Sequence, residues 1–214
     1  MDLNNLNMDI TNLHLFFVAT LLVVIAPGPG MLFVISRSIA GGRRAGIVSA
    51  LGTSTGIAVH ILAAGFGLSL ILFATETGFI IMKWVGGIYL IFLAWKAFTH
   101  RQTLTLESGN NDIGRISNFW QGLLVNALNP KVALFFIAFI PQFVNPVSGS
   151  VTVQMMVLGT IFMVLTVIVF SVYGISAAII GRWLIERPRV NRLIDWATGS
   201  LFVFLGIRMV GVTH

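Results

Sequence analysis

The segment VIAPGPGMLF, residues 24–33, places two prolines and two glycines within four positions of an otherwise apolar run. That run extends from about Leu13 to Ser36, and a bilayer-spanning helix needs about 20 residues. Proline removes a backbone donor and glycine adds backbone freedom, so the helix is predicted to break near its middle. The sequence therefore predicts a broken membrane helix in this region.

The composition predicts an all-α integral membrane protein. Of 214 residues, 57% are hydrophobic and 9% are charged, whereas a soluble domain carries about 25% charged residues. Apolar blocks that predict six transmembrane helices lie at about 13–36, 47–74, 79–98, 119–144, 151–180 and 193–212. The longest connection, about 99–118, is polar and reads as a solvated loop, so residues 1–214 are expected to form one membrane domain.

The basic residues predict the orientation of these helices. Ten of them lie in the loops after blocks one, three and five: Arg37, Arg43, Arg44, Lys96, Arg101, Arg115, Arg182, Arg187, Arg189 and Arg192. Lys83 and Arg208 fall on the opposite side. Cytoplasmic loops carry the excess of Lys and Arg, so both termini are expected outside. The net charge of +6 then reflects the membrane orientation of the loops and does not indicate binding of nucleic acid. No Lys or Arg precedes Arg37, so block one is expected to be a retained helix.

The two halves of the chain resemble each other weakly. Ordered matches join Pro27 and Phe33 to Pro130 and Phe136, Leu51-Gly52-Thr53 to Leu158-Gly159-Thr160, and Trp84, Gly87 and Phe92 to Trp196, Gly199 and Phe204. Each repeat, about 13–98 and about 119–212, has three helices. An odd number of helices ends on the opposite side of the membrane, so the second repeat must be inverted relative to the first. The first helix of each repeat, helix one or helix four, is predicted to be broken. Inverted repeats with broken helices in corresponding positions are typical of secondary transporters.

The broken segments, Pro27-Gly28-Pro29 and Asn129-Pro130, occupy corresponding places in blocks one and four. Backbone groups freed within a membrane are tolerated only against protein or a polar cavity. The helix that begins after each break presents free N–H groups and a positive dipole end, which suit a carboxylate. A purely structural kink is the alternative, and two matched breaks favour a substrate site.

Block four carries Asn126, Asn129 and Lys131 around its break. A lysine at a helix centre costs about 2.5–3.5 kcal/mol on insertion scales, so it needs a partner or a watery cavity unless it snorkels to an interface. We expect Lys131 to attract a substrate carboxylate or to gate the cavity. The two asparagine oxygens are expected to accept hydrogen bonds from the substrate ammonium group.

Three small residues of block two, Gly52, Thr53 and Gly56, share one helical face and predict close helix packing. His60 is the candidate for proton coupling, with a satisfied hydrogen-bonding histidine as the alternative reading. Gln142, within Pro141-Gln142-Phe143, is the candidate for closing the outer side, although simple helix termination by proline explains that segment as well.

Several functions are excluded or disfavoured by residues that the sequence lacks. The chain has no cysteine, which excludes a membrane thiol-electron carrier and thiolate metal sites. No Asp or Glu lies deep in any block, which argues against a sodium site or a metal site built from carboxylates. We therefore expect no enzyme activity, no cofactor and no metal.

The chain resembles the LysE/RhtB superfamily of bacterial amino-acid exporters over nearly its whole length, and its His60 segment is most similar to the homoserine/threonine exporter branch. The resemblance rests on residues 27–29, 41–46, 52–60, 83–90, 126–131 and 141–143. It implies proton-driven export of amino acids across the bacterial inner membrane, with the two broken segments facing each other. Ile57 stands near a position where some members have an acidic residue.

These observations predict a secondary exporter of small neutral amino acids, similar to threonine or homoserine, with protons and the lipid bilayer as its other partners. Export of other small organic anions by the same fold, or a membrane subunit that transports nothing, are the alternatives. The small-residue faces at Gly52/Gly56 and Gly86/Gly87 would serve a homodimer, or helix packing within one chain.

Overall fold

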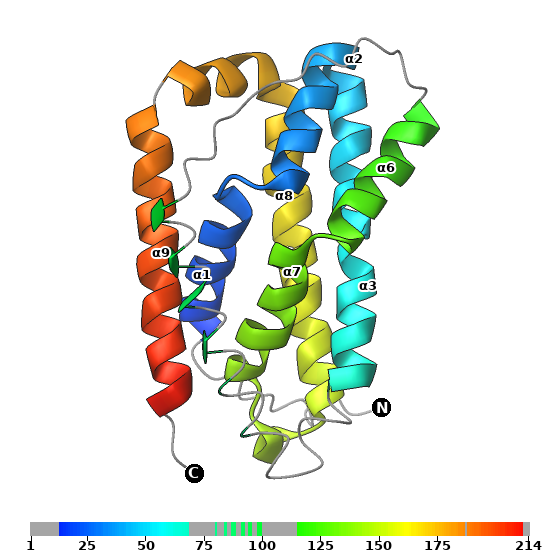
Figure 1. Cartoon of the computed structure of the whole chain (residues 1–214). Coiled ribbons are helices and arrows are strands. Elements are labelled where there is room, and N and C mark those ends of the chain that lie inside the picture. The colour runs from blue at the N-terminus through cyan, green and yellow to red at the C-terminus, as the bar shows by residue number, and fades with distance from the viewer. Residues whose placement is uncertain are drawn as a thin grey trace.

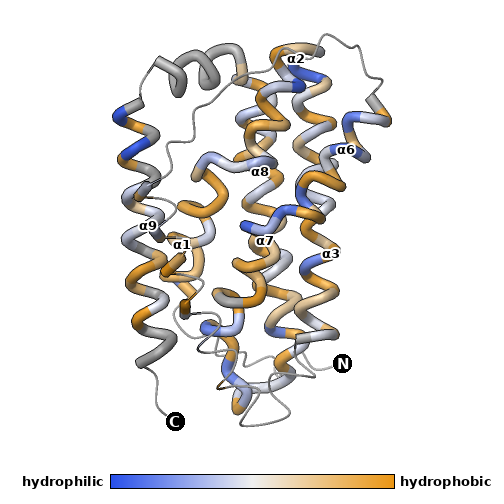
Figure 2. The backbone as a smooth tube through the Cα atoms, in the orientation of Figure 1, coloured by the Kyte–Doolittle hydropathy of each residue, from blue (hydrophilic) through white to orange (hydrophobic). Residues whose placement is uncertain are grey.

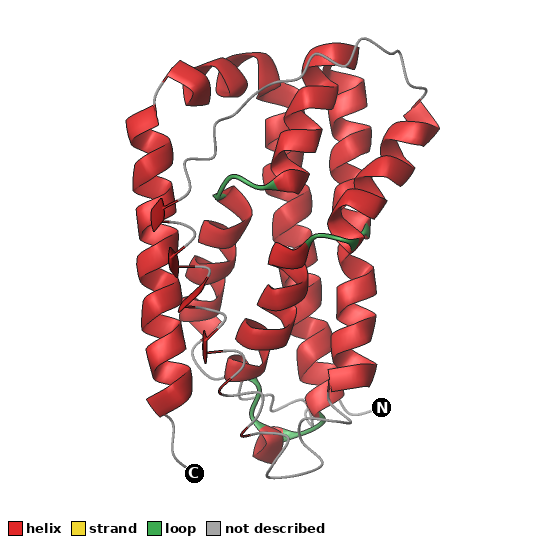
Figure 3. Ribbon diagram, viewed as in Figure 1, coloured by secondary structure: helices red, strands yellow, loops and turns green. Residues whose placement is uncertain are grey.

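The computed structural model describes residues 13–68, 115–186 and 188–211, with scattered residues between 80 and 99. Every element in these ranges is helical (Figure 3). The elements are α1 (Leu13–Ile25), α2 (Pro29–Thr55), α3 (Ile57–Leu62), η2 (Ala63–Leu68), α6 (Arg115–Ala127), α7 (Pro130–Leu134), η3 (Phe135–Phe139), η4 (Ile140–Phe143), η5 (Pro146–Ser148), α8 (Val151–Glu186) and α9 (Pro188–Gly211). The expectation of an all-helical chain is confirmed for the described residues.

The helices run side by side as a bundle of mostly apolar residues (Figures 1 and 2), and many large apolar side chains are exposed on it. Segments Pro29–Gly67 and Val151–Ala177 are long and apolar enough to cross a membrane, and Ile116–Ala127 with Pro130–Phe143 form a pair bent by 45°. Most of block three and of the 99–118 loop lies outside the described residues. The arrangement of six helices as two inverted repeats therefore stays a prediction.

Gly42 divides α2 into two antiparallel arms, residues 29–41 and 43–55. Its φ of 77° is in the left-handed region that favours glycine. A Cβ added at Gly46 would lie 2.6 Å from the Ser38 side chain, and one added at Gly30 would lie 3.0 Å from Thr53. These contacts pair the two arms as a hairpin. The first arm completes block one, and the second arm continues through α3 and η2 as block two (Figure 1).

The second arm of α2 packs backbone to backbone against α6. A Cβ at Gly52 would lie 2.1 Å from the Phe119 carbonyl oxygen, and one at Gly56 would lie 2.4 Å from the Leu123 carbonyl oxygen. Thr53, on the same face, donates its hydroxyl to the Ser49 carbonyl of its own helix. This glycine face is therefore used inside one chain. Of the second pair, Gly86 lies outside the described residues.

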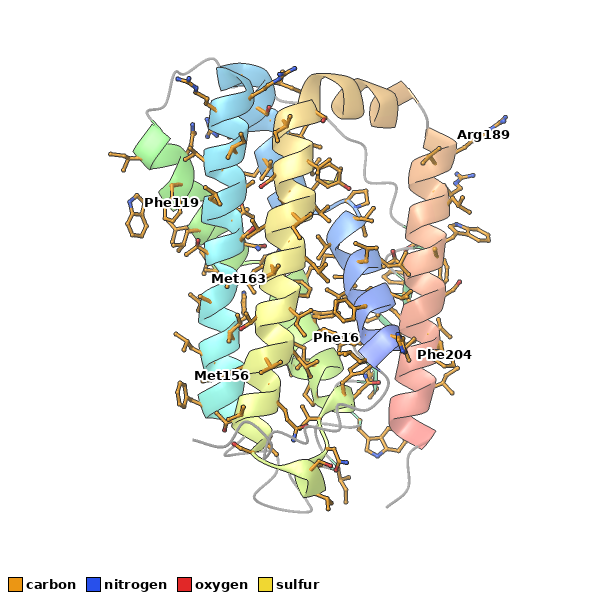
Figure 4. The ribbon with its side chains drawn as sticks, turned by 180° about the vertical axis from the view of Figure 1, so that it is seen from behind. Phe16, Phe119, Met156, Met163, Arg189 and Phe204 are labelled. Atoms are coloured by element: carbon orange, nitrogen blue, oxygen red, sulfur yellow. The ribbon has the colours of Figure 1, made fainter. Side chains whose placement is uncertain are left out.

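Aromatic rings fill the bundle between α1, η3, η4 and α8. The phenylalanine cluster consists of Phe16, Phe135, Phe136, Phe139, Phe143 and Phe162, all at most 2% exposed. Ring centroids lie 4.4 Å apart for Phe135 and Phe139 and 5.3 Å apart for Phe16 and Phe143. Phe16 lies in the half of the bundle where α1 begins, and Arg189 marks the opposite end (Figure 4).

Candidate site at the two helix breaks

Both predicted breaks are present and have the same construction. In each, an extended residue precedes a helix that begins with proline: Gly28, with φ −173° and ψ 174°, precedes Pro29, and Asn129, with φ −76° and ψ 111°, precedes Pro130. Proline suits a first helical position because the N–H it lacks would have no helical partner there. The structure thus pairs Pro29 with Pro130, two residues away from the match of Pro27 with Pro130 expected from the sequence.

Lys131 joins one break to the other. Its Nζ donates a hydrogen bond of 3.0 Å to the carbonyl oxygen of Ala26, which lies in the first break. The same Nζ lies 3.5 Å from the point that a Cβ at Gly28 would occupy. A Cβ at position 28 would therefore meet the lysine at ordinary van der Waals distance.

Two buried asparagines organise the second break. The Asn129 side-chain oxygen accepts a 3.0 Å bond from the Lys131 N–H and caps α7, and its Nδ2 donates to Asn126 Oδ1 at 3.1 Å. Asn126 Nδ2 donates to the Thr53 carbonyl at 2.8 Å, which ties α6 to the second arm of α2. Each asparagine oxygen has accepted one hydrogen bond and retains one lone pair.

Each proline leaves the carbonyl four residues before it without its usual helical N–H partner. Side chains from neighbouring helices bond to two of these carbonyls. Pro130 has no N–H for the Asn126 carbonyl, which instead accepts from the Asn129 N–H at 3.1 Å, and His60 Nε2 lies 3.0 Å from the same oxygen. Since a carbonyl only accepts, Nε2 carries the proton and donates it. Pro29 likewise cannot bond to the Ile25 carbonyl, and the Tyr173 hydroxyl donates to that oxygen at 3.3 Å. Tyr173 is not among the site residues predicted from the sequence, where its one signal is a hydroxyl-bearing aromatic within an apolar block.

A cavity of about 30 Å³ lies between the breaks. Its lining consists of Val23, Val24, Ala26, Gly28, Gly30, Met31, Asn126, Asn129, Lys131, Val132, Phe162, Thr166 and Phe170. The volume holds one or two waters and not an amino acid. No side chain caps the start of α2, so its first-turn N–H groups and the Lys131 ammonium make this end of the cavity electropositive.

The predicted site residues divide between the cavity and its surroundings. Gly28, Asn126, Asn129 and Lys131 line the cavity, and Pro29 and Pro130 begin the helices beside it. His60 contacts the Asn126 carbonyl but does not line the cavity, and Gln142, in η4, does not line it either. The described residues contain no group of three His, Cys, Asp or Glu side chains that would hold a metal.

A helical membrane bundle with two broken helices around a central cavity has the architecture of a membrane transport protein. The chain belongs to the LysE type translocator family, whose family model matches residues 21–211 and so includes both breaks. It is therefore a multi-pass membrane protein of a transporter family and not of an enzyme family.

Individual relatives cover nearly the whole chain. The homoserine/homoserine lactone efflux protein of Salmonella typhi is 30% identical over 199 residues, which cover 93% of this chain and 96% of the relative. The protein of the same description from Salmonella typhimurium is 29% identical with the same coverage. An uncharacterized membrane protein of Vibrio cholerae is 28% identical over 200 residues, covering 94% and 97%. No solved structure matches the chain.

Replacing Asn129 with alanine is expected to destabilise the second break. The substitution removes the cap from the Lys131 N–H and the donor to Asn126, and loss of a helix cap costs about 1 kcal/mol. For a chain of this size that loss lowers Tm by roughly 2–4 °C, measured on protein purified in detergent. Asn129→Ser keeps a capping oxygen, and its Tm is expected to fall clearly less than that of Asn129→Ala. Equal Tm values for Asn129→Ala and the unmodified protein would contradict the capping role.

Proposed function

We propose that this protein is a secondary exporter of small neutral amino acids from the cytoplasm, with its substrate site in the cavity between the two breaks. The observation that carries the proposal is the convergence of Lys131 and the uncapped start of α2 on one cavity. Two relatives described as homoserine/homoserine lactone efflux proteins support the substrate class.

The cavity offers donors for one end of an amino acid and acceptors for the other. The substrate carboxylate replaces the Ala26 carbonyl as the partner of Lys131 and meets the N–H groups at the start of α2. The substrate ammonium group donates to the remaining lone pairs of Asn126 and Asn129. A lactone presents a carbonyl oxygen to the same donors, so one site serves both compounds in the relatives' names.

Transport requires the half-helices to separate, because the cavity is too small for an amino acid. The phenylalanine cluster closes the half of the bundle where α1 begins, and Phe162 belongs both to it and to the cavity lining. In the proposed cycle, one three-helix unit rocks against the other and exposes the cavity to each side in turn. Gln142, in η4 beside the cluster residue Phe143, is proposed to close the outer end.

The distribution of arginines supports the orientation. The α2 hairpin, which carries exposed Arg43 and Arg44, and the start of α9, which carries exposed Arg189 and Arg192, lie at one end of the bundle (Figures 1 and 4). Helix α1 begins and α9 ends at the other end. By the positive-inside rule we place the arginine-rich end in the cytoplasm of a bacterial inner membrane and both termini outside.

Uptake into everted membrane vesicles tests this proposal. Everted vesicles expose the cytoplasmic side, so an exporter accumulates labelled substrate when a proton gradient is imposed. We expect uptake of threonine, homoserine or a similar neutral amino acid, and loss of uptake when the gradient is collapsed. Correctly inserted protein that takes up no amino acid would contradict the proposal. Uptake of small organic acids alone would instead favour the organic-anion alternative.

Proton coupling is proposed to use His60, the titratable side chain bonded directly to the second break. His60→Gln keeps an N–H donor for the Asn126 carbonyl and cannot take up a proton. We expect this variant to fold and to exchange labelled for unlabelled substrate, while losing most gradient-driven accumulation. Full gradient-driven accumulation in His60→Gln would restrict His60 to its hydrogen bond with Asn126.

A further inference from the structure

A second cation lies between the two broken helices, nearer to the arginine-rich end than Lys131. Arg37, on the first arm of α2, donates a 2.7 Å hydrogen bond from its guanidinium to the side-chain oxygen of Gln121 on α6. The Gln121 amide in turn donates to the Ser117 hydroxyl at 2.9 Å. The guanidinium also lies over the Phe33 ring, 5.3 Å from its centroid. Arg37 is thus held in one position between α2 and α6.

The position of Arg37 relates it to the cavity. It follows Pro29 by eight residues, which is about 12 Å along a helix, and Gln121 precedes Ala127, the last residue of α6 before the second break, by six residues, about 9 Å. Phe33 and Arg37 are four residues apart and share one face of the first arm. The Arg37–Gln121 pair therefore joins the same two broken helices that enclose the cavity, about two turns closer to the proposed cytoplasmic side.

The contacts of Arg37 leave its charge uncompensated. Within the described segments its partners are the Gln121 amide and the Phe33 ring, and neither carries a charge. A guanidinium has five N–H donors in a planar fork, and this fork matches the two oxygens of a carboxylate. Arg43 and Arg44 differ, since both are exposed at the hairpin tip. Arg37 is half-buried and fixed, as a binding residue would be.

We propose that Arg37, oriented by Gln121, is a recognition site for the free carboxylate of the substrate on the cytoplasmic side of the break cavity. The inference rests on the proposed export function and adds a specificity-determining residue to it. An amino acid binds Arg37 through its carboxylate before reaching Lys131. A lactone has no free carboxylate, gains nothing from the guanidinium fork, and reaches the cavity without this step.

Homoserine and homoserine lactone form a matched pair of probes, because the lactone lacks the free carboxylate. Initial uptake rates of both are measured in everted vesicles for the unmodified protein, Arg37→Gln and Arg43→Gln, each normalised to the amount of inserted protein. We expect Arg37→Gln to raise the KM for homoserine about tenfold, as loss of a charged hydrogen bond does, and to change the KM for the lactone less than about twofold. Arg43→Gln removes the same charge at the same end and is expected to change neither value.

Three outcomes would overturn the inference while leaving the proposed function intact. These are an unchanged homoserine KM in Arg37→Gln, an equal rise for homoserine and lactone, or an equal rise in Arg43→Gln. If Arg37→Gln does not insert into the membrane, Arg37→Lys takes its place, because lysine keeps the charge and loses the planar fork of donors. We then expect a smaller rise in the KM for homoserine and no rise in the KM for the lactone. Unmodified protein that takes up neither probe nor any other neutral amino acid would overturn the proposed function, and this inference with it.

Discussion

Replacing Lys131 with methionine is expected to lower kcat/KM for export by roughly 30-fold or more. Removing one partner of a desolvated, hydrogen-bonded charge pair costs about 2–5 kcal/mol, and each 1.4 kcal/mol is a factor of ten. Lys131 reaches across both breaks to the Ala26 carbonyl and is the cation in the cavity lining. The measurement is the initial rate of uptake in everted vesicles, over a range of substrate concentrations.

The methionine variant separates a loss of function from a loss of folding. A lysine at mid-membrane carries an insertion cost of about 2.5–3.5 kcal/mol, which methionine avoids, and the bond from the charged Nζ to Ala26 is worth about 1.5–3 kcal/mol. Thermal stability is therefore expected to stay the same or to rise. In contrast to Arg37→Gln, Lys131→Met is expected to weaken export of both homoserine and its lactone, and that of homoserine more strongly, because only homoserine presents a charged carboxylate to the lysine. Near-normal export in Lys131→Met would remove the lysine from the substrate site.

Replacing Gly52 with alanine is expected to destabilise the protein by about 3 kcal/mol or more, at the upper end of the range for overpacked cores. The added Cβ would lie 2.1 Å from the Phe119 carbonyl oxygen and 2.8 Å from the Phe119 Cα. These are backbone atoms, so no side-chain rotation relieves the clash and the helices must move apart. The expected fall in Tm is roughly 6–12 °C for a chain of this size, measured by thermal unfolding in detergent.

Gly67 provides the matched control for this experiment. It also lies in a helical segment, η2, but a Cβ added there meets nothing within 4 Å. Gly67→Ala is expected to leave Tm unchanged or to raise it slightly, since alanine is the better helix former. Equal Tm values for Gly52→Ala and Gly67→Ala would show that the α2–α6 contact is looser than described.

The breaks could be predicted from the sequence because their cause is local. Prolines at 29 and 130 cannot donate a backbone hydrogen bond, and this holds in any tertiary structure. The role of Gly42 was harder to predict from the sequence. Gly41 and Gly42 are adjacent, and the sequence does not show which of them has a positive φ. The pairing of Pro29 with Pro130 was missed because the extended residues before the two helices are a glycine and an asparagine.

The partners of the freed backbone groups could not be predicted, because they join residues far apart in the sequence. Tyr173 bonds to the Ile25 carbonyl across 148 positions, and His60 bonds to the Asn126 carbonyl across 66. Periodicity indicates which face of a helix is buried, but a single sequence gives no register between helices. The sequence therefore indicated Lys131 as important, and only the structure shows that Ala26 accepts its hydrogen bond.

The phenylalanine cluster has an electrical consequence. Its six rings are tightly packed, and a hydrophobic constriction of this kind expels water. Without a continuous file of water, neither a proton nor a small ion finds a conducting route through this cluster of the described residues. In the proposed exporter, this seal would keep the proton gradient across the membrane from being dissipated between transport cycles.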